Sequence, residues 1–203
     1  NAGGMVLVCR YGEAKVLVAV ERDAEAKVER SLDDQLGLRS APTAALTMSD
    51  TPAVLIDGPD AAARAEALLN AGVAAIARGV AARAGELALE YAENRYQGGG
   101  PIIIHGAVRD MLARISERRL AITPQPDLTG RIDLATALAQ KIVSTDAAGE
   151  STIDAVQVFG GMGYMHETGA EKLMRDAKYC QLYPTPNWLA RDELLELQRS
   201  PGR

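Results

Sequence analysis

Three glycines among four residues, Gly160, Gly161 and Gly163, form a turn near the end of the chain. Glycine adopts positive φ without strain and leaves backbone that another group can approach closely, so a preceding helix has to end there. A helical stretch over residues 134–159 leads into this turn, and a short charged helix over residues 170–180 follows it. Irregular backbone held between helices is a common setting for ligand binding, which makes these glycines the first candidates for a site.

The short helix leads into a second irregular segment, Tyr-Pro-Thr-Pro-Asn at residues 183–187. Proline cannot lie in a helix interior, so the pattern predicts a break and then a last helix over residues 188–198. Within the short helix, Arg175 and Asp176 are adjacent and cannot face each other along one side of the helix. Each is expected to pair with a neighbouring element, which is a structural role.

The remaining reactive residue types do not indicate a further site. His105 stands at the start of a helical stretch among isoleucines, where we expect it to be hydrogen-bonded or half-buried rather than catalytic. Cys9 and Cys180 are far apart, so the sequence indicates neither a disulfide framework nor a zinc site, and we assign no metal ligands. Cys180 is expected to be buried and unreactive.

The first part of the chain is predicted to form strands. Apolar, β-branched runs at residues 5–10 and 15–20, separated by Tyr11-Gly12-Glu13, are typical of a hairpin. Two shorter runs, at residues 44–48 and 53–56, predict two more strands. Four strands with open edges make a poor isolated sheet, so a partner surface or further strands are implied.

The pattern changes to helix at Pro59. An alanine- and leucine-rich stretch from there to Arg95 is longer than an ordinary globular helix and suits an antiparallel bundle. A second helix is predicted at residues 102–121, and a third starts near Gly130 and leads into the glycine turn.

Composition narrows the possible functions. The 203 residues carry a formal net charge of −5, which argues against non-specific nucleic-acid binding, because that needs a basic face. No apolar run approaches the length of a membrane span, and no charged leader precedes an apolar core. We therefore expect no membrane contact and a cytoplasmic location.

The glycine turn and the segments around it resemble the C-terminal part of the acyl-CoA dehydrogenases, flavoproteins that oxidise a CoA thioester to its α,β-enoyl form. The resemblance implies a mostly α fold with a small β part, in which a C-terminal four-helix bundle follows a partial antiparallel β-domain. The corresponding domains are residues 1–58 and 59–203. The matching residues are Gln157, Gly160, Gly161, Gly163, Tyr164, Arg175-Asp176-Ala177-Lys178 and Tyr183.

The resemblance also implies FAD, shared across a subunit interface. Arg95 opens a segment similar to the family's Arg-x-x-Phe-Gly-x-Pro-Ile, in which the arginine reaches the FAD pyrophosphate of the neighbouring subunit, and a guanidinium suits phosphate oxygens. Gly98 replaces the aromatic residue and Gly106 stands where a glutamine usually follows, which is expected to weaken this contact. The alternative is a solvated arginine at a helix C-terminus.

Four further residues are assigned to the cofactor by the same resemblance. The turn is implied to contact the adenosine side of a partner's FAD through Gln157, Gly160 and Gly161. Thr185 is also assigned to FAD. The alternative for the glycines is an ordinary helix cap.

The residue after Tyr183 is a glutamate in many family members, where it removes the α-proton of the acyl-CoA. A desolvated carboxylate suits that step because its pKa rises toward neutrality. Here the position holds Pro184, which has no acid–base group. Relatives that place the glutamate on the first long helix would carry it near Leu69 or Asn70, neither of which is a carboxylate, so Glu66, almost one turn away, is a weak candidate and another acid stays open.

Three hypotheses follow. The first is a subunit of a heteromeric acyl-CoA dehydrogenase that lacks its own base and relies on a homologous catalytic partner. The second is a self-sufficient acyl-CoA dehydrogenase, a homodimer or homotetramer with a relocated base such as Glu66. The third is a non-enzymatic helical interaction module. For either enzyme, the resemblance implies an acyl-CoA substrate and an electron-transfer flavoprotein as electron acceptor.

Two features of the first part of the chain also resemble the family. Residues 36–43 resemble a loop of its β-domain with the pattern Gly-hydrophobe-Arg-x-Ser-x-Thr, which we expect to be a structural turn. Asn1-Ala2 is either an expression scar or the Asn-Ala that follows a flavin-contacting tryptophan in the family. In the second case the chain is part of a longer protein.

Overall fold

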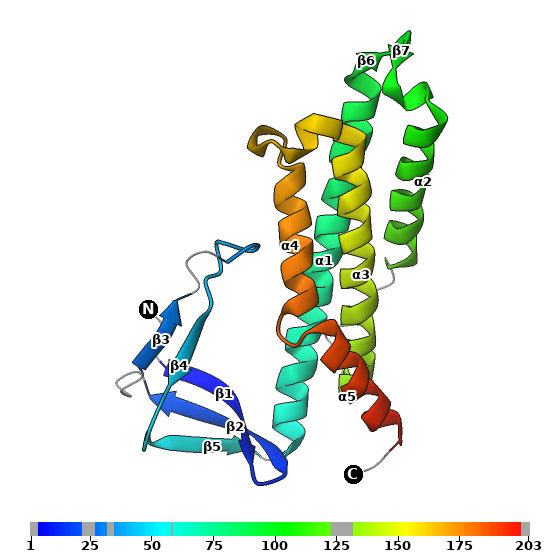
Figure 1. Cartoon of the computed structure of the whole chain (residues 1–203). Coiled ribbons are helices and arrows are strands. Elements are labelled where there is room, and N and C mark those ends of the chain that lie inside the picture. The colour runs from blue at the N-terminus through cyan, green and yellow to red at the C-terminus, as the bar shows by residue number, and fades with distance from the viewer. Residues whose placement is uncertain (1–3, 22–26, 32–34, 58, 123–131, 200–203) are drawn as a thin grey trace.

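A bundle of long helices with a small β part beside it makes up the molecule (Figure 1). The computed structural model describes residues 4–21, 27–31, 35–57, 59–122 and 132–199. This architecture confirms the predicted mostly α fold with a partial antiparallel β part. The helices are α1 (Pro59–Asn94), α2 (Gly106–Ala121), α3 (Leu134–Phe159), α4 (Ala170–Leu182) and α5 (Asn187–Arg199).

Helix α3 lies at the centre and packs against the other four helices, with its most extensive contact on α1. A stripe of alanines on α1 makes this close approach possible, because a methyl side chain lets two helix backbones come near each other. Five of these alanines, each 0–1% exposed, recur at the three- and four-residue spacing of one helix face: Ala74, Ala77, Ala81, Ala84 and Ala88.

The helix boundaries follow local chemistry. Helix α1 begins at Pro59, as predicted, and ends at Asn94. Gly130 lies outside the described residues, and α3 is described from Leu134, where the Asp133 side chain caps the helix by accepting a hydrogen bond from Thr136 N. Helix α3 ends at the predicted glycine turn, where Gly160 has a φ of 58°.

Helix α2 starts later than predicted. Between α1 and α2 the chain forms a minimal hairpin, β6 (Tyr96–Gln97) with β7 (Gly100–Pro101), and a 3₁₀ turn over Ile102–Ile104. His105 then adopts extended backbone, with φ −80° and ψ 130°, so the α-helix begins only at Gly106.

The β part holds the three-stranded antiparallel sheet β1 (Gly4–Tyr11), β2 (Ala14–Glu21) and β5 (Ala53–Asp57), in the order β1-β2-β5. The predicted hairpin is confirmed, with Met5 opposite Val20 and Arg10 opposite Lys15. A separate pair joins β3 (Lys27–Ser31) to β4 (Ala44–Thr47). Strand β3 was not predicted because Lys27, Glu29 and Arg30 leave it poor in β-forming residues.

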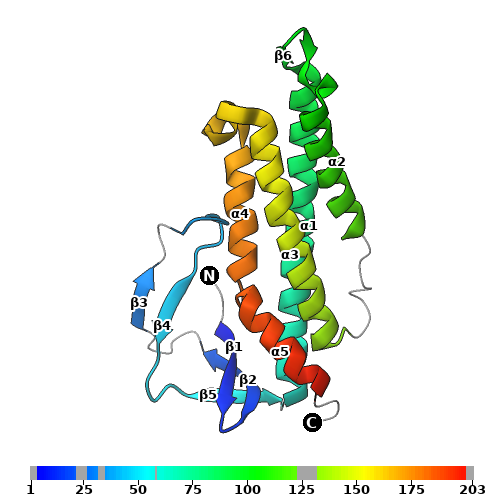
Figure 2. The same cartoon turned by 45° about the vertical axis from the view of Figure 1, so that its right-hand side comes forward.

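The sheet lies beside the start of α1 and near α5 (Figure 2). Lys15 of β2 ties these elements together, since its ammonium lies 2.8 Å from a carboxylate oxygen of Glu66 on α1 and 2.8 Å from one of Glu193 on α5. These ion pairs raise the pKa of Lys15, although partial burial opposes the shift most strongly.

One helix among the described residues, α1, is long and apolar enough to cross a membrane by length and composition alone. No apolar stretch of this length was expected from the sequence. The alanine face of α1 is buried within the bundle, and a buried core helix of a soluble protein can meet the same criteria, so this is weak evidence for a membrane span.

Candidate functional site

The structure brings Arg95 and the glycine turn to one cavity at the end of the bundle opposite the sheet. The cavity has a volume of about 380 Å³ and lies between the end of α1 and the end of α3. Its floor includes Tyr91 and Phe159, whose rings stack at 4.3 Å between centroids. Its lining residues are Tyr91, Arg95, Gln97, Ile102, Val158, Phe159, Gly160, Gly161 and Met162.

Arg95 is the cation of this cavity. Its backbone is fixed, because its carbonyl accepts a hydrogen bond of 2.8 Å from Ile102 N across the minimal hairpin. Its exposed guanidinium makes no hydrogen bond or ion pair with any other residue that the structure describes. An unpartnered guanidinium beside open glycine backbone suits a phosphate or another anion.

The glycine turn forms a 3₁₀ segment over Gly160–Tyr164. A β-carbon at Gly163 would lie 2.4 Å from the Val156 carbonyl oxygen, so only glycine fits at this position. Gly161 is exposed, and nothing lies within 4 Å of where its β-carbon would stand, so its backbone is open to a ligand. Gln157, grouped with these glycines from the sequence, is exposed on the last turn of α3 and does not line the cavity.

Thr185 lies elsewhere. It belongs to the turn between α4 and α5, and α4, whose 13 residues span about 20 Å, separates this turn from the glycine turn. The cofactor residues assigned from the sequence therefore form two groups at opposite ends of α4.

The α4–α5 turn, residues 183–187, carries no carboxylate among its own side chains. Pro184 is half-buried there. Glu66, the remaining candidate, has both carboxylate oxygens 2.8 Å from the Lys15 ammonium. Leu69 is exposed, and the buried Asn70 donates a hydrogen bond to the Glu66 carbonyl.

Sequence reasoning missed Lys141, which lies directly behind the α4–α5 turn. This lysine of α3 is completely buried, and its ammonium lies 2.6 Å from the carbonyl oxygen of Thr185. In the sequence, Lys141 shares one helix face with Leu138, Thr145 and Ala148, and this spacing could have indicated that it is buried. In the structure all four residues are buried.

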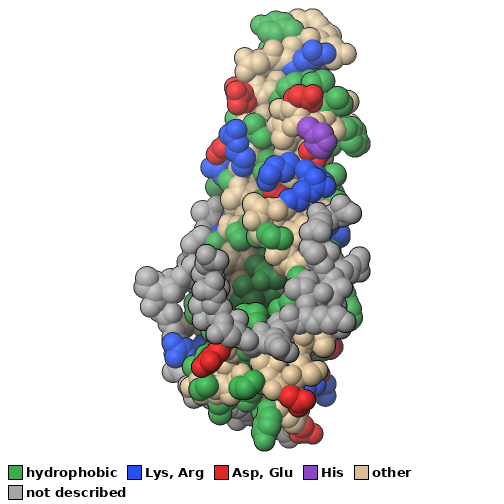
Figure 3. Space-filling model, turned by 90° about the vertical axis from the view of Figure 1, so that its left-hand side faces the viewer, with side chains coloured by type: hydrophobic (Ala, Val, Ile, Leu, Met, Phe, Trp, Pro, Cys, Tyr) green, Lys and Arg blue, Asp and Glu red, His purple; other side chains and the backbone are tan. Residues whose placement is uncertain are grey.

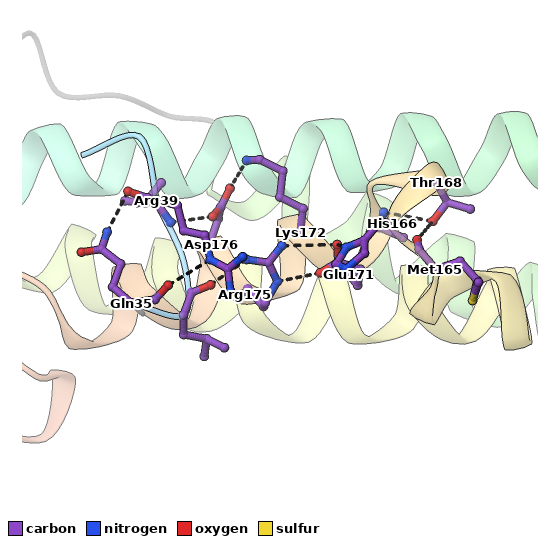
Figure 4. A network of polar contacts seen from close by, with 12 residues as sticks. Gln35, Arg39, Met165, His166, Thr168, Glu171, Lys172, Arg175 and Asp176 are labelled. Carbon is purple, nitrogen blue, oxygen red and sulfur yellow. Dashed lines mark hydrogen bonds and ion pairs between the residues drawn. The ribbon is translucent and has the colours of Figure 1, made fainter. Parts of the chain in front are cut away.

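Arg175 and Asp176 have the predicted structural role (Figure 4). Arg175 Nη1 donates to the Leu36 carbonyl over 2.7 Å, and Asp176 accepts a hydrogen bond of 2.7 Å from Leu38 N. These bonds fasten residues 35–43 to α4. Gln35 reinforces the loop from inside by donating to the carbonyls of Gly37 and Leu38.

The predicted roles of His105 and Cys180 agree with the structure. His105 Nε2 lies 3.0 Å from the Gln97 carbonyl, and Cys180 is fully buried, which raises the pKa of its thiol to about 11. No group of three metal-ligating side chains occurs in the ranges that the structure describes.

A further hollow with a hydrophobic floor opens between the β part and the helices (Figure 3).

Glu171 gives the loop-fastening network a pH dependence. Its carboxylate accepts a hydrogen bond of 2.6 Å from Arg175 and lies 2.7 Å from His166 Nδ1, and chiefly the Arg175 contact lowers the pKa of Glu171 to about 2. The unfolded value is near 4.5, so the stabilisation is complete above about pH 4.5 and is lost as the pH falls through about 2.

We therefore expect Glu171→Gln to lower the free energy of unfolding by about 2 kcal/mol at pH 7, the scale of a hydrogen bond to a charged group. The difference from the wild type should shrink as the pH falls below about 4.5, as measured by denaturant unfolding at several pH values. Glu167→Gln, at an exposed neighbouring carboxylate, is the control. A deficit of equal size at all pH values would contradict the assignment.

Comparison with known proteins agrees with the fold. The family model described as "Acyl-CoA dehydrogenase, C-terminal domain" matches residues 63–184. The chain is 37% identical over 127 residues to an acyl-CoA dehydrogenase of Bacillus subtilis (strain 168), which covers 59% of this chain and 33% of that protein. It is 31% identical over 185 residues to cyclohexane-1-carbonyl-CoA dehydrogenase of Syntrophus aciditrophicus (strain SB), covering 85% and 48% respectively.

A solved structure shows the same arrangement of elements. Butyryl-CoA dehydrogenase from Megasphaera elsdenii matches with a TM-score of 0.79 at 24% identity, over 97% of this chain and 56% of that chain. The chain thus spans less than half the length of the two curated relatives named above.

Proposed function

The chain belongs to the acyl-CoA dehydrogenase family, and from this premise we propose that it is a flavoprotein subunit for α,β-dehydrogenation of an acyl-CoA thioester. In this proposal the chain contributes to an FAD site, lacks its own catalytic glutamate, and relies on a homologous partner subunit for the base. One observation carries it: Arg95 and the glycine turn share a cavity, while the turn after Tyr183 holds no carboxylate.

The cavity fits part of FAD by its chemistry. The guanidinium of Arg95 would hold the pyrophosphate, and the open backbone at Gly160 and Gly161 would take the adenosine side. Gln157, on the last turn of α3 and outside the cavity lining, remains a proposed contact of the adenosine. FAD, when bound, supplies the acceptor for the hydride that leaves the β-carbon of the thioester. In this proposal the cofactor is shared between subunits, so that one chain serves two flavins, one through this cavity and one through Thr185 at the other end of α4.

The alternatives predict different behaviour on purification. A base-less subunit is colourless or poorly soluble alone and gains flavin when combined with its homologous partner. A self-sufficient enzyme is yellow alone and reduces its flavin when acyl-CoA is added. A non-enzymatic helical module stays colourless with any partner. The electron acceptor, which we propose to be an electron-transfer flavoprotein, is tested by adding it to the flavin-loaded complex.

Glu66→Gln separates the first two hypotheses directly. Because Lys15 holds both oxygens of the Glu66 carboxylate, we expect no change in flavin reduction by acyl-CoA in the assembled protein. Stability should fall by no more than about 1 kcal/mol, since Lys15 keeps Glu193 as a partner and the pair is partly exposed. Stopped-flow absorbance measures the reduction, and Glu193→Gln is the matched control. A loss of reduction in Glu66→Gln alone would establish Glu66 as the base.

A further inference from the structure

Lys141 is the largest of the fully buried side chains in the described residues. It lies in the middle of α3, next to Leu138 and Ile142, which pack with Ala190 of α5 in a buried cluster. A buried amino group destabilises the fold unless its donors are satisfied, so its partners are informative.

All three acceptors of the Lys141 ammonium come from one short segment of the chain. Nζ lies 2.6 Å from the Thr185 carbonyl, 2.6 Å from Asn187 Oδ1 and 3.3 Å from the Gln181 carbonyl. A lysine ammonium has three donors, and here each has an acceptor between the last turn of α4 and the first residue of α5. Burial lowers the pKa of Lys141 to about 8, with Asp146 and Cys180 opposing the shift and Arg191 adding to it, so the side chain remains mostly protonated at pH 7.

A second group of contacts anchors the same segment one turn further along α3. Asn187 Nδ2 donates to Thr145 Oγ1 over 2.9 Å and to Asp146 Oδ1 over 2.8 Å. Gln181 Nε2 also donates to Asp146 Oδ1, over 3.0 Å. The segment is thus held on α3 by side chains at both of its ends.

The segment has little means of fixing itself. Pro184 and Pro186 have no backbone N–H, so two of the five residues at positions 183–187 cannot donate a main-chain hydrogen bond. The carbonyl groups at the end of α4 also lack partners within the helix. Lys141 supplies donors where the turn offers acceptors.

We infer that Lys141 is a positioning residue that holds the α4–α5 turn, and with it Thr185 and position 184, in a fixed place against α3. Its consequence for flavin rests on the proposed function, because Thr185 is the cofactor residue of this turn. The positioning role itself rests only on the contacts of Lys141 and Asn187. Lys141 contacts the turn from the side of α3, and we assign it no contact with substrate or cofactor.

The test is amide hydrogen exchange followed by mass spectrometry on Lys141→Met. Methionine fills a similar volume without donors, so the Thr185 and Gln181 carbonyls and Asn187 Oδ1 lose their donor while the apolar packing around position 141 is kept. We expect peptides covering residues 183–190 to exchange at least about tenfold faster, with α1 and the rest of α3 unchanged. Asn187→Ala removes the second anchor and should produce the same local pattern. Lys172→Met, at an exposed lysine of α4, is the control and should leave the turn as in the wild type.

Two results would overturn the inference: unchanged exchange in the turn for both Lys141→Met and Asn187→Ala, or a rise spread evenly over all helices. The FAD content of the assembled protein separates this inference from the proposed function. Faster exchange together with lost FAD supports both. Faster exchange with full FAD content supports the positioning role and removes Thr185 from the flavin site.

Discussion

Replacing Arg95 by alanine is expected to weaken FAD binding by the assembled protein about 10- to 100-fold, the cost of losing one or two charge-assisted hydrogen bonds. The bundle should keep its stability, because the guanidinium makes no hydrogen bond or ion pair with the other residues that the structure describes. The expected loss is therefore a binding effect alone. Flavin fluorescence during FAD titration measures the affinity, and denaturant unfolding measures the stability.

Two further variants sharpen this result. Arg95→Lys keeps the charge but loses the planar fork of donors, so its affinity should lie between those of the wild type and Arg95→Ala. Arg109→Ala, at an exposed arginine of α2 outside the cavity, should bind FAD as the wild type does. The affinity lost in Arg95→Ala should also shrink at high salt, where a phosphate contact is screened. Unchanged FAD affinity in Arg95→Ala would remove the phosphate assignment.

Much of the fold could be predicted because local chemistry decides it. The hairpin of β1 and β2 follows from two β-branched runs around Gly12, whose φ of 61° suits glycine. The end of α3 follows from Gly160 in the same way. Strand β3 could not be predicted because pairing with β4 defines it more than its own composition does.

The candidate site was predictable only in part, since its contacts join residues distant in sequence. Arg95 and Gly161 were each identified from their own segments, but only packing of α1 on α3 brings them to one cavity. The ammonium of buried Lys141 donates to Asn187, 46 positions later in the chain. The carboxylate of Glu66 is bound by the ammonium of Lys15, 51 positions earlier. Contacts between residues so far apart cannot be predicted directly from a single sequence.

Residues 35–43 show how tightly tertiary contact can constrain a loop. Leu38 has a φ of 47°, a left-handed conformation that is strained for leucine, and its N–H is held by Asp176. At Gly37 the loop backbone meets α4 directly. A β-carbon there would lie 2.2 Å from the Arg175 carbonyl oxygen and 2.9 Å from the Asp176 α-carbon. Both atoms belong to helix backbone, which cannot yield as a flexible side chain would.

Gly37→Ala should therefore lift the loop off α4 and break the bonds from Leu38 N to Asp176 and from Arg175 to the Leu36 carbonyl. We expect a loss of about 3 kcal/mol in the free energy of unfolding, the sum of two weakened hydrogen bonds to charged groups. Denaturant unfolding measures it, and faster amide exchange in residues 36–43 locates it. Gly72→Ala is the matched control, because nothing lies within 4 Å of the new methyl group and alanine favours the α1 helix, so that variant should gain up to about 1 kcal/mol. Equal behaviour of the two variants would mean that loop and helix do not meet at Gly37.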